Sequence, residues 1–344
     1  MKTMFENIAA LSAIAGTSGD EGRVREYIYN EIKDLPGCSF SSDGAGNLLV
    51  AKKGGSPAKN RLIFTAHMDE VGFIITHITD SGFLRFTAIG GIDTRLMSGK
   101  RVLVGCGLIP GLMGSKAMHQ ASDDERKKAA NIDELYIDIG ADSKEAAEKL
   151  VRLGDRAVWD TDFTEFGDSR ILGKALDDRA GCALLMELLK DEAAHDFTAA
   201  FTTREEVGGN GASSAAFGAE PDIAVVVEST TAGDVAGVPE EKWVCHQGGG
   251  PVVSFIDRGT VYDMDLYTTI MDWAQQEHIP AQTKHGRYGG NDAAHIHSSR
   301  DGVRPVAVSL PARYIHAPAA SLLRSDVEDT AKLLRLLRDR LTEL

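Results

Sequence analysis

Basic residues are scarce in this sequence. Lysine and arginine together number 37, against 51 aspartates and glutamates, which gives a formal net charge of −14 at pH 7. Proteins that bind nucleic acids neutralise many phosphates with a basic surface. The acidic balance therefore argues against a nucleic-acid partner.

Long apolar runs are also missing. No stretch reaches the roughly 18 apolar residues that a membrane-spanning helix needs, so no membrane partner is expected. Lys2 is the only basic residue in residues 1–16, whereas Phe5, Ile8 and Leu11 recur at helical spacing. We expect an amphipathic first helix there, not a secretion signal.

Cysteine is rare as well, and its spacing excludes the paired motifs of zinc ribbons and redox proteins. Isolated cysteines fit the reducing environment of the cytoplasm, which is where we expect the protein. The cysteines are Cys38, Cys106, Cys182 and Cys245.

Apolar strand-like runs alternate with amphipathic helices along most of the 344 residues. This alternation predicts an α/β fold with helices on both faces of a sheet. Residues 47–53 and 61–67 predict two strands in quick succession, which suggests a hairpin. Near the carboxyl end, a helix is expected from Ser325, with Glu328 completing a capping box.

The pattern of predicted strands and helices changes at residues 71–160. Short strands crowd together there with glycine turns and one charged helix, which indicates an inserted β-rich module. The remaining residues, 1–70 and 161–344, then form the main domain. A charged run at residues 122–130 predicts a solvated loop inside the insert.

Histidines and carboxylates stand where the predicted strands end. Loops at the carboxyl ends of strands form the ligand crevice of an open α/β sheet. The spacing of His67 and Asp69 lets this aspartate orient the imidazole, and Asp177 opens a helix, where the dipole favours an ionised carboxylate. Imidazole nitrogens and carboxylate oxygens together suit zinc, cobalt or manganese. The candidates are His67, Asp69, Asp177, Asp178, Glu205, Glu206, Glu228, Asp234 and His316.

Each candidate alone has a simpler explanation, such as a hydrogen-bonded histidine or a helix cap. Their coincidence at the ends of separate strands is what indicates a site. For His77, His195 and His278 we expect structural roles. Four other histidines lie in glycine-rich or loop-like segments and are pocket candidates without a ligand role: His119, His285, His295 and His297.

Several longer motifs resemble the dinuclear metallo-aminopeptidase family that includes the tetrahedral (TET) and the glutamyl and deblocking aminopeptidases. Some of its members were formerly labelled endoglucanases. The resemblance runs from about residue 5 to the end and implies an exopeptidase-type mixed sheet with an inserted β-domain that builds an oligomeric shell. The motifs are "AHMDEVGF", "IGGIDTRLMSGKRVLV", "KALDDRAGC", "TTREEVGGNGA", "GGNDA" and "RYIHAP".

The resemblance also implies roles for the candidates. Asp177 would bridge two divalent metal ions, with Glu206 and His316 completing one site and His67 and Glu228 completing the other. The family more often has aspartate where Glu228 stands, so Asp234 remains an alternative ligand in that turn. Two further departures, at Asn291 and His295, lie near the expected substrate pocket.

Glu205 would be the general base, and Asp69 would assist catalysis by orienting the imidazole of His67. Two nearby cations would explain why Glu205 and Glu206 stand together despite their like charges. Glu205 would take a proton from a water activated by the metals and return it to the leaving amine. These roles predict a cytoplasmic aminopeptidase that trims oligopeptides and assembles as a homo-oligomer, expected to be a dodecamer.

Three other functions stay open at this point. A di-metal amidohydrolase or carboxypeptidase would use a related fold, a glycosidase would use paired carboxylates without metal, and a scaffold protein would keep a vestigial site. The preferred amino-terminal residue and the physiological metal are also open. Lys284, His285 and Arg287 suggest a preference for acidic amino-terminal residues.

Overall fold

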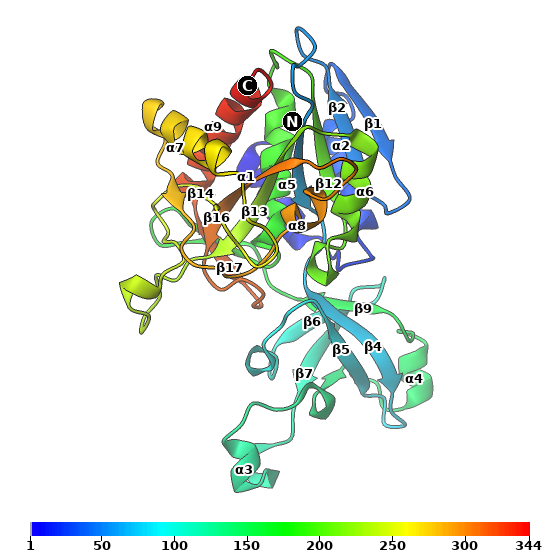
Figure 1. The fold of residues 1–344 in the computed structure, drawn as a ribbon. Coiled ribbons are helices and arrows are strands. Elements are labelled where there is room, and N and C mark those ends of the chain that lie inside the picture. The colour runs from blue at the N-terminus through cyan, green and yellow to red at the C-terminus, as the bar shows by residue number, and fades with distance from the viewer. Residues whose placement is uncertain (1) are drawn as a thin grey trace.

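The computed structural model describes residues 2–344, apart from the side chains of residues 124 and 125. The chain forms a larger lobe built on a mixed sheet and a smaller lobe built on a closed barrel (Figure 1). The helices are α1 (Met4–Ala13), α2 (Gly22–Ile32), α3 (Asp123–Arg126), α4 (Lys144–Glu148), α5 (Leu176–Lys190), α6 (Asn210–Ala219), α7 (Met264–Gln276), α8 (Ala293–Ile296) and α9 (Arg324–Leu341).

The strands are distributed between the two lobes. The larger lobe contains β1 (Cys38–Ser42), β2 (Leu48–Lys52), β3 (Leu62–His67), β10 (Thr164–Phe166), β11 (Arg170–Gly173), β12 (Phe197–Thr202), β13 (Ile223–Thr231), β14 (Val252–Val253), β15 (Gln282–Thr283), β16 (Arg304–Ala312) and β17 (Ala320–Leu323). The smaller lobe contains β4 (Gly72–Ile78), β5 (Leu84–Ile89), β6 (Arg101–Val104), β7 (Ile109–Gly114), β8 (Tyr136–Asp138) and β9 (Arg156–Trp159).

The main sheet has the order β1-β2-β12-β3-β13-β16-β14-β15. Its four central strands, β12, β3, β13 and β16, are mutually parallel, so their carboxyl ends meet at one edge. Alternate side chains of a strand face opposite sides of a sheet. On β3, Phe64 and Ala66 join the core formed with α1, α2, α5 and α9, whereas Ile63 joins the core beneath α6 and α8. The predicted α/β fold with helices on both faces is confirmed.

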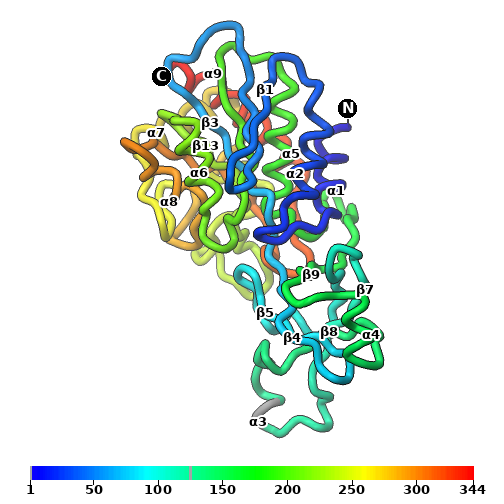
Figure 2. Tube along the Cα trace, turned by 90° about the vertical axis from the view of Figure 1, so that its right-hand side faces the viewer, coloured from blue at the N-terminus to red at the C-terminus, as the bar shows by residue number. Residues whose placement is uncertain are grey.

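The smaller lobe is an antiparallel barrel with the order β4-β5-β8-β7-β6-β9. Its interior is filled by buried apolar side chains, among them Phe73, Phe86 and Trp159, whose rings meet edge to face. The chain passes from the larger lobe into the barrel after β3. The short helix α3 lies at the end of the smaller lobe that is farthest from the larger lobe (Figure 2). The predicted small β-rich domain is therefore present, and it is closed.

Three local predictions are wrong. The strands at 47–53 and 61–67 do not form a hairpin, because β12 lies between β2 and β3. Helix α9 begins at Arg324 after the N-cap residue Leu323, without a side-chain cap bond, so the capping box is absent. The charged run at 122–130 is not a simple loop, since it contains α3.

None of the helices described is both long and apolar enough to span a bilayer.

Candidate metal centre

His67 stands at the end of β3 and is held by the loop that follows. Its ring is 1% exposed, and Nδ1 donates a hydrogen bond to the main-chain oxygen of Asp69 at 3.0 Å. The carboxylate of Asp69 lies 3.4 Å from the same nitrogen and accepts a hydrogen bond from Ser18 at 2.6 Å. A donating Nδ1 leaves the lone pair of Nε2 available for a metal ion.

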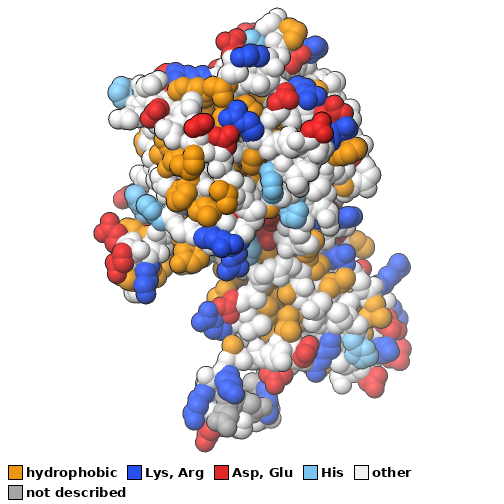
Figure 3. All heavy atoms as spheres, in the orientation of Figure 1, with side chains coloured by type: hydrophobic (Ala, Val, Ile, Leu, Met, Phe, Trp, Pro, Cys, Tyr) orange, Lys and Arg blue, Asp and Glu red, His pale blue; other side chains and the backbone are white. Residues whose placement is uncertain are grey.

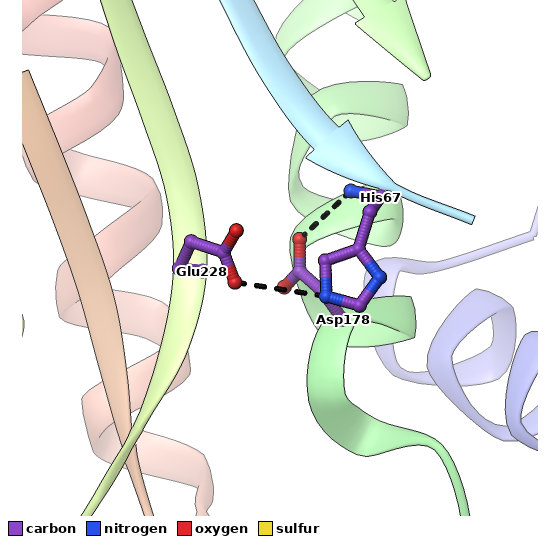
Figure 4. Close-up of side chains that lie close together, drawn as sticks. All are labelled: His67, Asp178 and Glu228. Carbon is purple, nitrogen blue, oxygen red and sulfur yellow. Dashed lines mark hydrogen bonds and ion pairs between the residues drawn. The ribbon is translucent and has the colours of Figure 1, made fainter. Parts of the chain in front are cut away.

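A first group of ligand-type atoms surrounds Nε2 of His67. One atom each from His67, Asp178 and Glu228 lies within 4.8 Å of the others. The close-up shows the imidazole between β13, which carries Glu228, and α5, which carries Asp178 (Figure 4). Nε2 lies 3.6 Å from Oε2 of Glu228. Both oxygens of Asp178 already accept hydrogen bonds, from the backbone N–H groups of His67 and Gly181.

A second group joins Asp177 to both histidines. Asp177 Oδ1 lies 3.5 Å from Nε2 of His67, and Oδ2 lies 3.5 Å from Nε2 of His316. His316 is in turn 3.2 Å from Oε2 of Glu206. Asp177 therefore faces the two halves of the cluster with one oxygen each, an arrangement suited to a bridging ligand.

The adjacent glutamates are held by backbone contacts to Asp69. The N–H of Glu205 donates to Asp69 Oδ1 at 3.1 Å, and the N–H of Glu206 donates to Oδ2 at 3.2 Å. Asp69 thus orients both the imidazole and the turn η4 (Glu205–Val207). Among the described residues, none forms a hydrogen bond or ion pair with the carboxylate of Glu205, whereas Glu206 is paired with His316.

The barrel also reaches the centre, through the turn after β5. His316 Nδ1 donates to the main-chain oxygen of Gly91 at 2.9 Å. Gly90 has a φ of +77°, and a Cβ there would lie 2.8 Å from Val71 and 3.3 Å from Cβ of Glu206, so only glycine fits comfortably there. The motif "IGGID" therefore has a positional role that its sequence did not indicate.

Burial and mutual repulsion raise the pKa of most carboxylates in the cluster. Burial is the main reason that the pKa of Glu205 rises to about 9, and repulsion from Asp292 and Glu206 adds to it. Burial alone would lower the pKa of His316, but hydrogen bonds to Asp177 and Glu206 raise it to about 11. Burial also opposes a charge on His67, but Glu228 and the hydrogen bond to Asp177 raise the pKa of His67 above its usual value.

Divalent ions fit this donor set. Asp177 Oδ1 and Glu228 Oε1 are buried without a hydrogen-bond donor among the residues described, which is costly for a carboxylate. Two imidazoles and several carboxylates match the ligand preferences of zinc, cobalt and manganese.

The sequence candidates do not all lie in this centre. Eight of them meet in this centre, whereas Asp234 pairs with Arg313 at 2.7 Å and also accepts the N–H of Gln247. Glu228, not Asp234, is therefore the residue of that segment that faces His67. The eight are His67, Asp69, Asp177, Asp178, Glu205, Glu206, Glu228 and His316.

The sequence did not identify Asp292 as a site residue. It lies in the motif "GGNDA", which has no spacing typical of metal ligands. It is 1% exposed and accepts a hydrogen bond from Thr202 at 2.8 Å, while its second oxygen has no donor in the described part of the chain. Burial raises its pKa to about 7. Its position at the start of a helix was the available signal.

The remaining histidines lie outside the centre. His195 contacts Ser56 and pairs with Glu343 at 2.6 Å, which fits the expected structural role. His295 packs its ring against Gly209, close behind the Glu205 turn, where a Cβ would meet the imidazole at 2.1 Å. His295 is thus a pocket candidate that packs against the end of the turn that carries the two glutamates.

Comparison with known proteins identifies the family. The model of the M42 glutamyl aminopeptidases matches residues 46–333. The chain belongs to this family. A relative from Acetivibrio thermocellus that carries the name aminopeptidase is 35% identical over 96% of this chain and 97% of its own.

Solved structures agree with the M42 assignment. A TET aminopeptidase from the marine sediment archaeon Thaumarchaeota superimposes with a TM-score of 0.94 at 33% identity, covering 99% of this chain and 97% of its own. The TET1 peptidase of Pyrococcus horikoshii, which can assemble into a tetrahedron or a large octahedral shell, gives a TM-score of 0.86 at 34% identity. It covers 98% of this chain and 100% of its own. This M42 protein is a hydrolase, an aminopeptidase.

Proposed function

We propose that this M42 aminopeptidase trims oligopeptides with the help of two divalent metal ions held in the cluster around Asp177. The observation that carries the proposal is the placement of the two Asp177 oxygens, one toward His67 and one toward His316. His67 and Glu228 would hold one ion, and Glu206 and His316 would hold the other. Asp178 supports His67, since backbone donors already occupy both of its oxygens.

Glu205 is the general base in this proposal. Its carboxylate is close to the cluster and has no hydrogen-bond or ion-pair partner among the residues described, so it is available to receive a proton from the attacking water and to return it to the leaving amine. When bound, the ions supply Lewis acidity toward that water and toward the scissile carbonyl. Asp69 positions both Glu205 and His67 and does not itself exchange the proton.

The metal is zinc or cobalt, with manganese as the third candidate. Imidazole nitrogen favours zinc and cobalt, whereas the high share of carboxylate oxygen also suits manganese. The amino terminus of a peptide is a cation, which a carboxylate-rich site attracts, and an internal peptide bond offers no such group.

A panel of peptides tests the proposal against its alternatives. Peptides with a free amino terminus should be cut one residue at a time, whereas amino-blocked versions of the same peptides should not. A carboxypeptidase would cut the amino-blocked peptides from the carboxyl end. A di-metal amidohydrolase would show neither stepwise cleavage from the amino end nor cleavage from the carboxyl end. Activity on oligosaccharides that survives a chelator would favour a glycosidase.

Lys284 gives a reason to expect acidic amino-terminal residues. Its side chain is 4% exposed, and in the part of the chain described here no residue forms a hydrogen bond or ion pair with its Nζ. Burial lowers the pKa of Lys284, while the carboxylates of Asp257 and Glu228 oppose that effect. A glutamyl or aspartyl side chain of the substrate would supply the missing partner.

The acidic preference is tested with glutamyl and leucyl p-nitroanilides. Wild type should cleave the glutamyl compound faster, and Lys284→Met should remove that preference. Arg287→Met, at an exposed position of the same basic segment, shows whether the effect is specific to the buried Lys284. Faster cleavage of the leucyl compound by wild type would contradict the idea.

The protein is proposed to work as a cytoplasmic homo-dodecamer. A tetrahedral shell of equivalent copies, as in the Pyrococcus horikoshii peptidase, is a dodecamer. Residues 1–70 and 161–344 would form the catalytic domain, and residues 71–160 the oligomerisation domain. The smaller lobe projects from the larger one and carries hydrophobic side chains on its surface (Figure 3), as expected for a contact surface.

A further inference from the structure

A buried ion cluster lies directly behind the metal centre. Its members are Glu70, Lys174 and Arg179, all at most 2% exposed, and they are called the Glu70 cluster below. Lys174 Nζ lies 2.7 and 2.9 Å from the two oxygens of Glu70, and the Arg179 guanidinium lies 3.3 Å from one of them. The mechanism proposed above does not use any of these three residues.

The cluster connects the two segments that carry the central ligands. Glu70 follows Asp69 in the loop after β3, and Lys174 and Arg179 stand on either side of Asp177 in the chain. Ion pairs between these residues therefore fix the distance between the β3 loop and the start of α5. A shift of either segment would move His67 relative to Asp177.

Arg179 makes further contacts with main-chain oxygens. Its Nε donates to the oxygen of Met68, between His67 and Asp69, at 2.7 Å. Its other nitrogens donate to the oxygens of Leu11, Ile14 and Gly16, at and after the end of α1.

The same amino-terminal segment also bonds back to the cluster. The N–H of Gly16 donates to Glu70 at 3.1 Å, and Lys174 donates to the oxygen of Ile14 at 2.9 Å. Gly16 has no room for a side chain, since a Cβ would lie 2.9 Å from Arg179. The end of α1, the β3 loop and the start of α5 are thus locked together.

We propose that Glu70, Lys174 and Arg179 are positioning residues for the metal centre, which hold His67 and Asp177 at the separation that metal binding needs. This inference rests on the proposed function, because it assumes that these two residues are ligands. Residues that orient metal ligands from behind typically change metal affinity or activity by about 10–100-fold when they are replaced.

Lys52 provides a matched control for Lys174. It is also buried, at 5% exposure, and its Nζ also donates to main-chain oxygens, those of Pro36 and Leu189. It lies on β2 and has no carboxylate partner among the residues described. Lys52→Met and Lys174→Met therefore both remove a buried ammonium, but only the second breaks the Glu70 cluster.

The test measures cobalt binding by metal-free protein, with the visible absorption spectrum of the bound cobalt as the readout of ligand geometry. Lys174→Met should bind cobalt about 10–100-fold more weakly and show an altered spectrum. Lys52→Met should keep the wild-type affinity and spectrum. Glu70→Gln, which preserves shape and removes only the charge, is the second variant and should behave like Lys174→Met.

Wild-type affinity and spectrum in both Glu70→Gln and Lys174→Met would overturn the inference and leave the cluster a purely structural one. Cobalt binding by wild type checks the proposed function separately. If wild type bound no cobalt, the metal centre itself would be wrong, and the positioning role would fall with it.

Discussion

At the scale of single residues, the two adjacent glutamates are distinguished by what their carboxylates contact. Glu206 is paired with His316 and faces Asp177, whereas the carboxylate of Glu205 has no partner among the described residues. Their backbone N–H groups share one acceptor, Asp69. One carboxylate is thus committed to the cluster, and the other is free to accept a proton.

This difference predicts opposite behaviour for two conservative variants. In the proposed mechanism Glu205→Gln removes the proton acceptor but no ligand, so metal content should stay near wild type while turnover falls by at least about 10²–10⁴-fold. Glu206→Gln replaces a proposed anionic ligand with a neutral one, so one ion should bind more weakly and excess zinc or cobalt should restore part of the activity. Metal stoichiometry and turnover of both variants are measured together. Metal loss in Glu205→Gln with full metal in Glu206→Gln would reverse the assignment.

The residues that the sequence could reveal share a local signal. His67, Asp177 and Glu206 follow recognisable strands or open a helix, so their convergence follows from the ordinary geometry of parallel sheets. Ser18 and Gly91 lack such a signal, because their contacts depend on how a loop and the barrel fold back on the site. Such long-range contacts leave no trace in the sequence near each residue.

At the scale of elements, local patterns predicted the strands but not their partners. β2 and β3 are close in sequence, yet β12 pairs with both of them. A hairpin would have left the apolar strand β12 outside the sheet, whereas its insertion buries Ala199, Ala200 and Phe201. Pairing was decided by total burial, which is a property of the whole sheet.

The turn after β5 gives a prediction about the contact between the lobes. Gly90 has a φ of +77°, and a Cβ there would lie 2.8 Å from Val71 and 3.3 Å from Glu206. Gly90→Ala should displace Glu206 and lower turnover by about 10- to 100-fold. The control is Gly99→Ala, since Gly99 also has a φ of +77° but none of the described residues lies within 4 Å of its Cβ position.

Both glycine variants should lose roughly 1–2 kcal/mol of stability from the left-handed backbone alone. Only Gly90→Ala should change turnover, measured by steady-state kinetics at saturating metal. Equal turnover in the two variants would show that the barrel turn does not position Glu206.

At the scale of the whole molecule, the acidic cluster links metal binding to stability and pH. Burial and nearby carboxylates raise the pKa of Glu205 to about 9, and burial raises that of Asp292 to about 7. In metal-free protein these groups hold protons that the unfolded chain releases near pH 4. The free energy of unfolding of metal-free protein should therefore fall as the pH rises from about 5 to about 9.

In the proposed centre, bound divalent ions would stabilise the ionised carboxylates and remove this loss. The increase in Tm on adding zinc should be larger at about pH 8.5 than at about pH 6. Differential scanning calorimetry of the metal-free and zinc-loaded protein measures both. An equal increase at the two pH values would contradict the link between the carboxylates and the ions.

Assembly gives a second prediction at this scale. The barrel exposes large apolar side chains, including Leu112 at 50% and Met118 at 72%. If the barrel joins the copies, Leu112→Asp combined with Met118→Asp should lower the molar mass found by light scattering. Val261→Asp is the control, since Val261 is 80% exposed but lies on the larger lobe. A monomeric wild type at micromolar concentration and saturating metal would contradict the assembly.

The most direct test of the two-metal centre is a titration of activity against metal content. The protein is stripped of metal with a chelator, zinc or cobalt is returned in steps, and bound metal and cleavage of a free-amine peptide are measured on the same samples. The geometry around Asp177 predicts no activity in the stripped protein and full activity at two bound ions per chain. Activity that is unchanged after the metal has been removed would contradict the account.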